Sequence, residues 1–392
     1  LVIAFARAFT MVRLLFGSAC FCIALLAIVP APNGTLWMLA IGVTEWGHWL
    51  AAVALLTLLP GWSATRAGSA GAMLGVLAAL LALYPITRAT LLARRLPGDL
   101  QRTFGNTPAR SNSGAPPRSA PLSGLDLIRG VGSPEVAVQS VVYVSRGAKD
   151  LRLDVYQPPP AGPPAPCVVV IHGGSWQRYD STQLAKLNYY LAARGYIVAS
   201  INYRLSPEFK FPAARDDLRS AIAFLKENHE RFRLDPERLV LLGRSAGGQL
   251  ALLVAYGDKD PAVRGVVGFY GMTDLGYIYS HPANPRVIDS RDILRAHLGG
   301  SPEEVPALYE EASPTSHVSR DVPPTLLIHG GRDELFPWAL SELLDSRLSE
   351  AGASHYFLRL PWATHGCDFN FSGPSGQIST YAIERFIASV TK

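Results

Sequence analysis

Three long apolar runs dominate the N-terminal part of the chain. Residues 14–29, 36–59 and 70–86 carry almost no charge, and each run is about as long as a helix that crosses a membrane. Short segments that contain proline and glycine separate the runs. This pattern predicts a helical transmembrane region over residues 1–96, with one span for each run.

Two features of this region have alternative explanations. Arg7 and Arg13 precede the first run, which is also typical of a signal peptide, although a signal peptide would account for one run only. Glu45 and His48 lie one helical turn apart within the second run. Helix packing or an interfacial position accounts for this pair, and a functional site is the alternative.

From residue 125 onward, short apolar runs alternate with amphipathic segments. Residues 138–144 and 151–156 predict a first hairpin, and residues 216–227 predict a helix with one apolar face. Residues 275–324 interrupt the alternation, as either a cap over a site or a plain surface excursion. We expect one α/β domain over residues 125–392, with a mostly parallel sheet flanked by helices. The later strands are expected at 167–171, 196–203, 240–242, 263–270, 325–329 and 356–360.

The segment between these two parts has a different composition. Residues 97–124 are rich in Pro, Ser, Gly, Asn and Arg and show no apolar period, which predicts a flexible linker and a separable catalytic domain. Arginines in and before this segment account for much of the formal net charge of +5. Anionic lipid is the partner that they favour, because no nucleic-acid-binding motif is present. Arginines flank the first run as well, so the positive charges do not decide which side of a membrane the catalytic domain faces.

A candidate nucleophile lies in the middle of the α/β part. An apolar run ending at residue 242 leads into G-x-S-x-G at residues 243–247, and a helix-like segment follows. A strand, a tight turn and a helix form the setting in which this motif exposes a catalytic serine, here Ser245. A closely packed glycine loop without a catalytic role is the alternative.

Donors for an oxyanion are expected upstream of this serine. The buried-strand pattern at residues 167–171 leads into the sequence H-G-G-S-W. Acyl transfer requires backbone N–H groups that point at the developing oxyanion, and glycine allows the main chain to approach a carbonyl closely. The N–H groups of Gly173, Gly174 and Ala246 are therefore predicted to form an oxyanion hole. A turn that only ends the strand is the alternative for the two glycines.

The partners of the serine are expected at two later strand ends. Asp333 follows one buried-strand pattern and His365 follows the next, so the chain order is Ser, Asp, His. Ser245 would attack, His365 would take and return the proton, and Asp333 would orient the imidazole. Glu334 and Asp274 are rival acids and His329 is a rival base, with a structural role favoured for His329. A solvated loop histidine is the alternative for His365.

These motifs resemble the branch of the α/β-hydrolase superfamily formed by esterases and lipases with an H-G-G motif. The sequences at 153–158, 202–206 and 211–214 are similar to those of carboxylesterases, feruloyl and acetyl-xylan esterases, aryl formamidases and prenylcysteine methylesterases. The resemblance begins at about residue 138 and continues to the C-terminus. It implies an α/β-hydrolase fold and cleavage of carboxylic esters through an acyl-enzyme. The whole expected architecture is this fold with a cap-like insertion, preceded by the transmembrane region inferred from the apolar runs.

The chain departs from the resemblance at two positions. Arg244 precedes the nucleophile where an acidic or amide residue is frequent, and the glycine often found after Trp176 is absent. Because Trp176 and Arg244 adjoin the oxyanion motif and the nucleophile, they are our candidates for binding the substrate.

The expected chemistry needs no cofactor, and no metal-ligand spacing is present. The expected partners are an ester substrate and membrane lipids. Both lipid-derived and small soluble esters are consistent with a membrane-anchored esterase. Amide cleavage, as by an arylformamidase or a peptidase, would use the same residues. A catalytically silent membrane interaction module is the alternative from another class. The sequence leaves the oligomeric state open.

Overall fold

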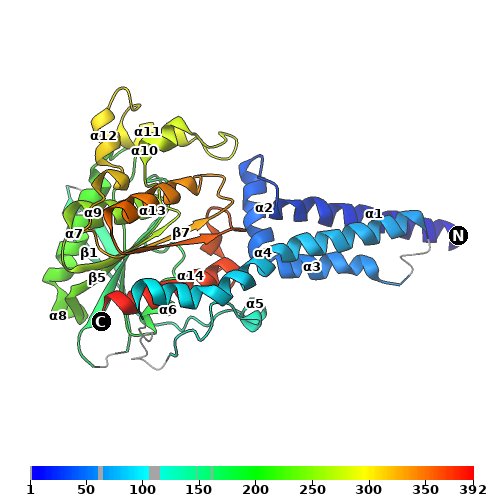
Figure 1. The fold of residues 1–392 in the computed structure, drawn as a ribbon, viewed down its shortest axis with the longest axis horizontal. Helices are drawn as coiled ribbons and strands as arrows, with labels where there is room; N and C mark the ends of the chain where they lie inside the picture. Colours follow the sequence, from blue (N-terminus) through cyan, green and yellow to red (C-terminus); the bar gives the residue numbers. More distant parts are fainter. Residues whose placement is uncertain (1, 61–64, 106–114, 148, 160–161) are drawn as a thin grey trace.

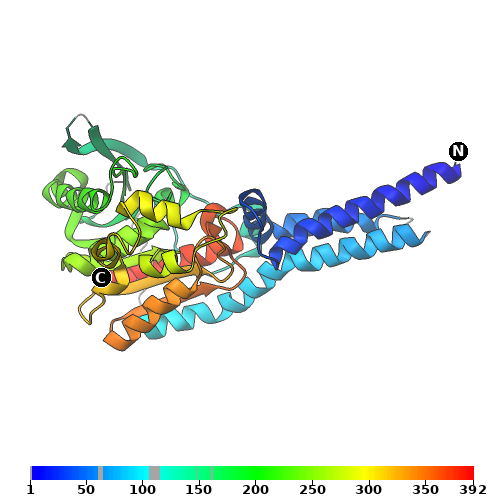
Figure 2. The ribbon, with the colours of Figure 1, turned by 90° about the horizontal axis from the view of Figure 1, so that it is seen from above.

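The molecule consists of an N-terminal helical bundle that projects from a larger α/β domain (Figures 1 and 2). The bundle and the α/β domain follow each other in the sequence and are in contact along several elements. The computed structural model describes residues 2–60, 65–105, 115–147, 149–159 and 162–392.

The α/β domain is built on one sheet. Within the described residues its strands are β1 (Ala137–Arg146), β2 (Lys149–Gln157), β3 (Ala165–Ile171), β4 (Ile197–Ile201), β5 (Leu234–Arg244), β6 (Val263–Phe269), β7 (Thr325–Gly330) and β8 (His355–Leu360). Their order in the sheet is β1-β2-β4-β3-β5-β6-β7-β8. β1 and β2 form an antiparallel hairpin, β2 pairs antiparallel with β4, and all pairs from β4 to β8 are parallel. The expected hairpin and the mostly parallel sheet are confirmed.

Helices cover both faces of this sheet, which explains why β3 is buried along its whole length and reads as a continuous apolar run. One layer consists of α7 (Ala213–Glu227), α9 (Ala246–Asp258) and α13 (Ala339–Ala351). The opposite layer contains α6 (Lys186–Ala192) and α14 (Pro374–Val390). The parallel strands therefore all end at one edge, where residues from different strands meet.

The expected insertion at 275–324 lies between β6 and β7. It contains the short helices α10 (Leu275–Ser280), α11 (Ser290–Leu298) and α12 (Pro306–Glu311), which lie together beside the α/β domain (Figure 1). The insertion also contacts the N-terminal part of the chain, because the backbone N–H of Gly34 donates to the carbonyl oxygen of Arg286 at 3.1 Å.

The bundle contains α1 (Val2–Ala24), α3 (Gly47–Ala54) and the N-terminal half of α4 (Arg66–Phe104), whereas α2 (Gly34–Glu45) lies across their direction (Figure 1). The second apolar run is therefore not one straight helix, because the chain bends by 86° between α2 and the helical stretch that follows it. By length and composition, α1 and α4 could each cross a membrane, and the bent pair would add a third crossing only if it counts as one span.

The structure corrects the flexible linker expected at 97–124. α4 continues through Pro97 to Phe104, and the buried Leu96 and Leu100 belong to the same apolar core as α14. The hydroxyl of Tyr356 on β8 donates to Asp99 at 3.2 Å. The segment after residue 114 is packed as well, and residues 106–114 lie outside the described ranges. Apolar positions spaced by four residues continue past Pro97, and their burial outweighs the cost of proline in a helix, about 3 kcal/mol.

Candidate active site

The sharp turn between β5 and α9 holds Ser245 at the carboxyl edge of the sheet. Ser245 has φ 53° and ψ −117°, a backbone conformation that few side-chain-bearing residues adopt. The turn is possible because a Cβ at Gly247 would lie 2.2 Å from the carbonyl oxygen of Ile171, so this position requires glycine. The strained turn raises the serine hydroxyl above the strand ends, as the motif predicts.

The structure brings the three predicted triad residues together. The Nε2 atom of His365 lies 3.1 Å from Oγ of Ser245, and its Nδ1 atom lies 2.7 Å from Oδ2 of Asp333. Because a carboxylate only accepts hydrogen bonds, Nδ1 carries the proton and Nε2 is left to accept the serine proton. Ser245 and His365 are buried, with 7% and 6% of their surface exposed. The arrangement can therefore relay a proton away from a serine that attacks a carbonyl.

Both oxygen atoms of the buried Asp333 carboxylate have hydrogen-bond partners. Its Oδ1 atom accepts the backbone N–H groups of Leu335 and Phe336 at 2.9 and 2.8 Å. Its Oδ2 atom lies 3.1 Å from Nε2 of His329, in addition to the contact with His365. Burial alone would raise the pKa of Asp333, but the two histidines outweigh it and hold that pKa well below its usual value. The acid thus stays ionised opposite the imidazole.

The rival residues are placed elsewhere. Glu334 accepts the backbone N–H of Ala31 at 3.0 Å, and burial raises the pKa of its carboxyl group. Asp274 accepts the backbone N–H of Tyr277 and thereby caps the N-terminus of α10. His329 is fully buried, and its Nδ1 atom lies 2.7 Å from Oγ of Ser341, so it supports Asp333 and does not reach Ser245.

The predicted oxyanion donors are only partly free. The N–H of Gly173 donates to Oε1 of Gln183 at 2.7 Å, so this donor is occupied by a side chain. Gly174 has φ 101°, and a Cβ there would lie 2.2 Å from the carbonyl oxygen of Arg178. Ala246 is the first residue of α9, where a backbone N–H has no acceptor within the helix. Gly174 and Ala246 are thus the better placed of the three.

The two predicted substrate-binding residues point into the protein. Arg244 is 2% exposed, and its Nε atom donates to Oδ2 of Asp368 at 2.5 Å. Trp176 is fully buried, stacks on His297 of the insertion with ring centres 4.0 Å apart, and donates from Nε1 to Gln249. Both side chains are therefore held by buried partners, and their role as substrate contacts stays a prediction. Sequence order alone does not reveal that the side chains at these positions face inward.

Sequence reasoning missed a buried polar group that supports His365. The ring of Tyr270 lies 4.4 Å from the ring of His365, and the Tyr270 hydroxyl donates to Oδ1 of Asp368. Asp368 also binds Arg244, so the residue before the nucleophile is linked to the turn that carries the base. Burial, with the nearby Asp368 carboxylate, raises the pKa of Tyr270 well above its usual value, so the phenol remains protonated as the donor. The only sequence signal for this group was an acidic residue three positions after His365.

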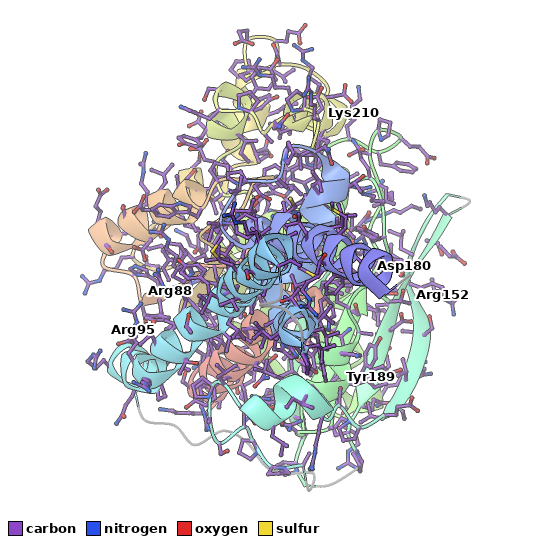
Figure 3. The ribbon with its side chains drawn as sticks, turned by 90° about the vertical axis from the view of Figure 1, so that its right-hand side faces the viewer. Arg88, Arg95, Arg152, Asp180, Tyr189 and Lys210 are labelled. Atoms are coloured by element: carbon purple, nitrogen blue, oxygen red, sulfur yellow. The ribbon has the colours of Figure 1, made fainter. Side chains whose placement is uncertain are left out.

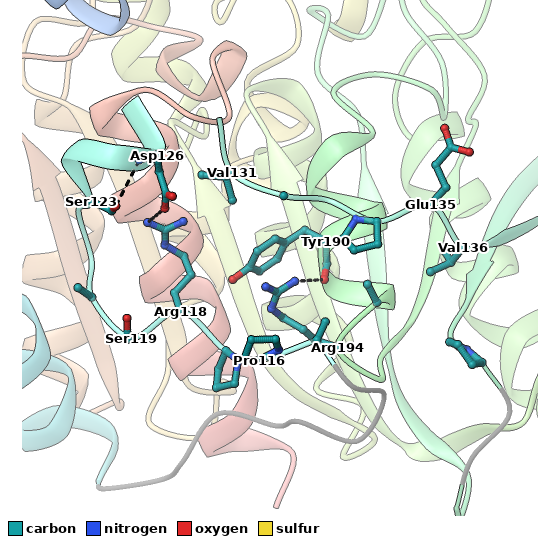
Figure 4. Close-up of a pocket in the computed structure, with 17 residues that line it drawn as sticks. Pro116, Arg118, Ser119, Ser123, Asp126, Val131, Glu135, Val136, Tyr190 and Arg194 are labelled. Atoms are coloured by element: carbon teal, nitrogen blue, oxygen red, sulfur yellow. Dashed lines mark hydrogen bonds and ion pairs between the residues drawn. The ribbon is translucent and has the colours of Figure 1, made fainter. Parts of the chain in front are cut away.

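A cavity of about 700 Å³ lies apart from the triad, between α6 and the segment after residue 114 (Figure 4). Arg118 and Arg194 line it, and both are already paired: Arg118 with Asp126 at 3.1 Å and Arg194 with Glu384 at 3.2 Å. None of the triad residues lines this cavity. Among the described residues, no group of three or more His, Cys, Asp or Glu side chains is arranged to hold a metal ion.

Curated relatives cover the catalytic part of the chain. Esterase LipC of Mycobacterium tuberculosis is 31% identical over 243 residues, which is 58% of this chain and 59% of LipC. Esterase LipQ of the same organism is 30% identical over 266 residues, which is 64% of this chain and 62% of LipQ. A probable isoprenylcysteine alpha-carbonyl methylesterase of Oryza sativa is 27% identical over 58% of each chain. The chain thus spans about three fifths of the length of these relatives.

Solved structures have the same fold. The bacterial heroin esterase is 21% identical with a TM-score of 0.59, and the match covers 67% of this chain and 86% of that one. The carboxylesterase EstE1, cloned from a metagenomic library, is 23% identical with a TM-score of 0.59, over 67% of this chain and 92% of that one. The sheet order and flanking helices are therefore those of an α/β-hydrolase. The BD-FAE family model matches residues 153–348, half of the chain, and the chain accordingly belongs to the BD-FAE family.

Proposed function

We propose that the protein is a membrane-attached serine hydrolase that cleaves carboxylic esters through an acyl-enzyme. The observation that carries this proposal is the relay Ser245–His365–Asp333, with contacts of 3.1 and 2.7 Å. The similarity to esterases supports an ester over another acyl compound.

The geometry supports a two-step reaction. Oγ of Ser245 attacks the ester carbonyl carbon while its proton passes to Nε2 of His365. The N–H groups of Gly174 and Ala246 stabilise the oxyanion of the tetrahedral intermediate. The intermediate collapses as the ester C–O bond breaks, and His365 gives its proton to the departing alcohol. Water, activated by the same histidine, then releases the acid and restores the serine.

Membrane attachment is the second part of the proposal. α1 and α4 are long and apolar enough to cross a bilayer, and the carboxyl edge of the sheet faces the bundle (Figure 1). Figure 3, which looks along the bundle, shows Arg88 and Arg95 on α4, beyond its apolar part. Arginines in this position suit the headgroup region of a membrane. The reaction would then take place close to the bilayer surface.

The same placement favours lipid-derived esters as the substrate class. Met38, Trp46 and Phe369 expose apolar side chains at the boundary between the bundle and the α/β domain. The rings of Trp46 and Phe369 lie 6.4 Å apart, so this apolar surface is shared by both parts of the chain. A bilayer-resident ester would meet this surface on its way to Ser245, whereas a small soluble ester would not need it.

The test is a series of p-nitrophenyl esters of increasing acyl length, assayed on the full chain in detergent micelles. We expect hydrolysis that depends on Ser245, with kcat/KM rising from short to long acyl chains. Ser245→Ala, which removes only the hydroxyl group, is the matched control. Turnover by Ser245→Ala similar to that of the wild type would exclude this serine, and a preference for short chains would exclude the lipid substrate class. Faster cleavage of an arylformamide than of any ester would favour the amide alternative.

A further inference from the structure

The segment that joins α1 to α3 lies against the two turns that carry the catalytic acid and base. We call residues 25–46, which include α2, the docking segment. In both ribbon views it lies between the bundle and the α/β domain (Figures 1 and 2). The turn after β7 carries Asp333 and the turn after β8 carries His365, and a neighbour of each residue in the sequence contacts this segment.

The docking segment holds the acid turn on both sides of Asp333. The guanidinium group of Arg332 donates from Nη1 to the carbonyl oxygen of Leu26 at 3.0 Å and from Nη2 to that of Val29 at 2.8 Å. Glu334, the other neighbour of Asp333, accepts the N–H of Ala31 at 3.0 Å. These contacts fix the residues on either side of the acid to a part of the chain about 300 residues away.

The base turn is held by a shorter chain of hydrogen bonds. Nε1 of Trp37, on α2, donates to Oγ1 of Thr364 at 3.1 Å. Oγ1 of Thr364 in turn donates to the carbonyl oxygen of His365 at 3.2 Å. Thr364 is fully buried, and Trp37 packs against the core of the α/β domain. The indole is therefore connected to the backbone of the catalytic histidine through one hydroxyl group.

A second contact holds the far end of the base turn. The buried side chain of Glu45 accepts the backbone N–H of Ser375 at 3.0 Å and its hydroxyl at 2.6 Å, at the start of α14. Asn370 donates from Nδ2 to the carbonyl oxygen of Glu45 at 3.1 Å. The turn from Thr364 to Ser375 is thus fixed to α2 at both of its ends.

The backbone dihedral angles φ and ψ of a turn can change easily, so a turn needs contacts that fix its position. A displacement of about 1 Å from the reactive geometry can lower the rate about 10²-fold. We infer that the docking segment is a positioning part of the active site, and that Trp37 orients His365 through Thr364. This inference rests on the proposed function. Trp37 is a positioning residue because it contacts the turn that carries His365 and not the reacting atoms.

The test compares variants at both ends of the Trp37–Thr364 hydrogen bond, using the full chain in detergent and a short soluble ester. Trp37→Phe keeps an aromatic ring but removes the donor, and Thr364→Val keeps the shape but removes the hydroxyl. We expect each to lower kcat by about tenfold to a hundredfold, with KM changed less than twofold. Thr364→Ser should retain most of the wild-type kcat because it keeps the hydroxyl group. Trp49→Phe, at an exposed tryptophan on α3, is the matched control and should leave kcat unchanged.

The double variant distinguishes the loss of one shared hydrogen bond from general destabilisation of the protein. If both residues act through one hydrogen bond, Trp37→Phe combined with Thr364→Val lowers kcat about as much as either change alone. Wild-type kcat in both single variants, or fully multiplicative losses in the double variant, would overturn the inference. Thr364→Val removes the same hydrogen bond at the residue next to His365. If Trp37→Phe accumulates poorly, kcat of Thr364→Val alone still tests the inference. Failure of the proposed function would look different, because hydrolysis by the wild type would not depend on Ser245.

Discussion

Asp333 and Glu334 are neighbours in the sequence, but the structure gives them different partners. Asp333 faces His365, whereas Glu334 faces Ala31 of the docking segment. We predict that Asp333→Asn lowers kcat by about 10⁴-fold, because an amide at this position does not select the required imidazole tautomer. Glu334→Gln should cause only a mild loss, since the amide oxygen still accepts the Ala31 N–H. Steady-state kinetics on a soluble ester check this pair, and a larger loss in Glu334→Gln would contradict the assignment of the acid.

Gly174 offers a second test at the level of one residue. A side chain here is strained by φ 101° and collides with the carbonyl oxygen of Arg178, so Gly174→Ala should displace the backbone donor. We expect kcat to fall by about 10²- to 10³-fold, with a smaller effect on the binding of a substrate analogue. Gly257→Ala is the control, because nothing lies within 4 Å of a Cβ there. Equal losses of binding and rate in Gly174→Ala would indicate a structural role only.

The triad residues could be predicted because each follows a strand-like run in a fixed order along the chain. Local patterns alone selected Ser245, Asp333 and His365, and the structure brings these three residues into contact, while their catalytic roles stay a prediction. The pairing of Arg244 with the buried Asp368 could not be predicted, because no local pattern connects these two residues. The contact between Trp37 and Thr364 could not be predicted, since no motif connects an apolar run near the N-terminus to Thr364.

At the level of elements, α4 joins the two parts of the molecule as one continuous helix. Its N-terminal half belongs to the bundle and its C-terminal half packs with α14 on the sheet. We predict that Leu96→Ala, at a fully buried position of α4, lowers the free energy of unfolding by about 2–5 kcal/mol. Leu91→Ala, on the same helix but 59% exposed, should change it little. Thermal unfolding in one detergent compares the two, and equal shifts would contradict the packing of α4.

Two predictions of secondary structure that rested on composition were wrong, one for the second apolar run and one for the segment after Pro97. The second apolar run has the length of a span, but apolar composition does not reveal the break at Trp46, where φ −121° and ψ 20° end α2. The segment after Pro97 looks like a linker because polar residues dominate it. Leu96, Leu100 and Phe104 nevertheless repeat every four residues, and their tertiary burial decides the conformation. The strands, by contrast, follow from local apolar runs and were predicted with few changes.

For the whole molecule, the two parts should behave as one membrane-attached unit. If α1 and α4 cross the bilayer, apolar burial and not arginine–lipid attraction holds the chain. We therefore predict that the full chain stays in the membrane fraction after washes with high salt and with alkaline carbonate. Immunoblots of pellet and supernatant, with a peripheral protein as the control, provide the measurement. Release of the full chain by either wash would contradict the spanning helices.

The separable catalytic domain expected from the sequence does not agree with these contacts. A chain beginning at Leu125 would lack α4 and the docking segment, and would expose the apolar surface of α14 that Leu96 and Leu100 cover. Such long-range contacts form between segments with no shared pattern, so one sequence contains no signal for them. We therefore expect a chain that begins at Leu125 to be less stable than the full chain.

Ser245 can be tested as the nucleophile by identifying the residue that a fluorophosphonate modifies in the membrane-embedded full chain. Peptide mass spectrometry after labelling should find the adduct on Ser245, because its hydroxyl lies 3.1 Å from Nε2 of His365, which Asp333 orients through Nδ1. Labelling should disappear in Ser245→Ala and become much slower in His365→Ala. An adduct on another residue, or undiminished labelling of Ser245→Ala, would contradict the assignment of Ser245 as the nucleophile.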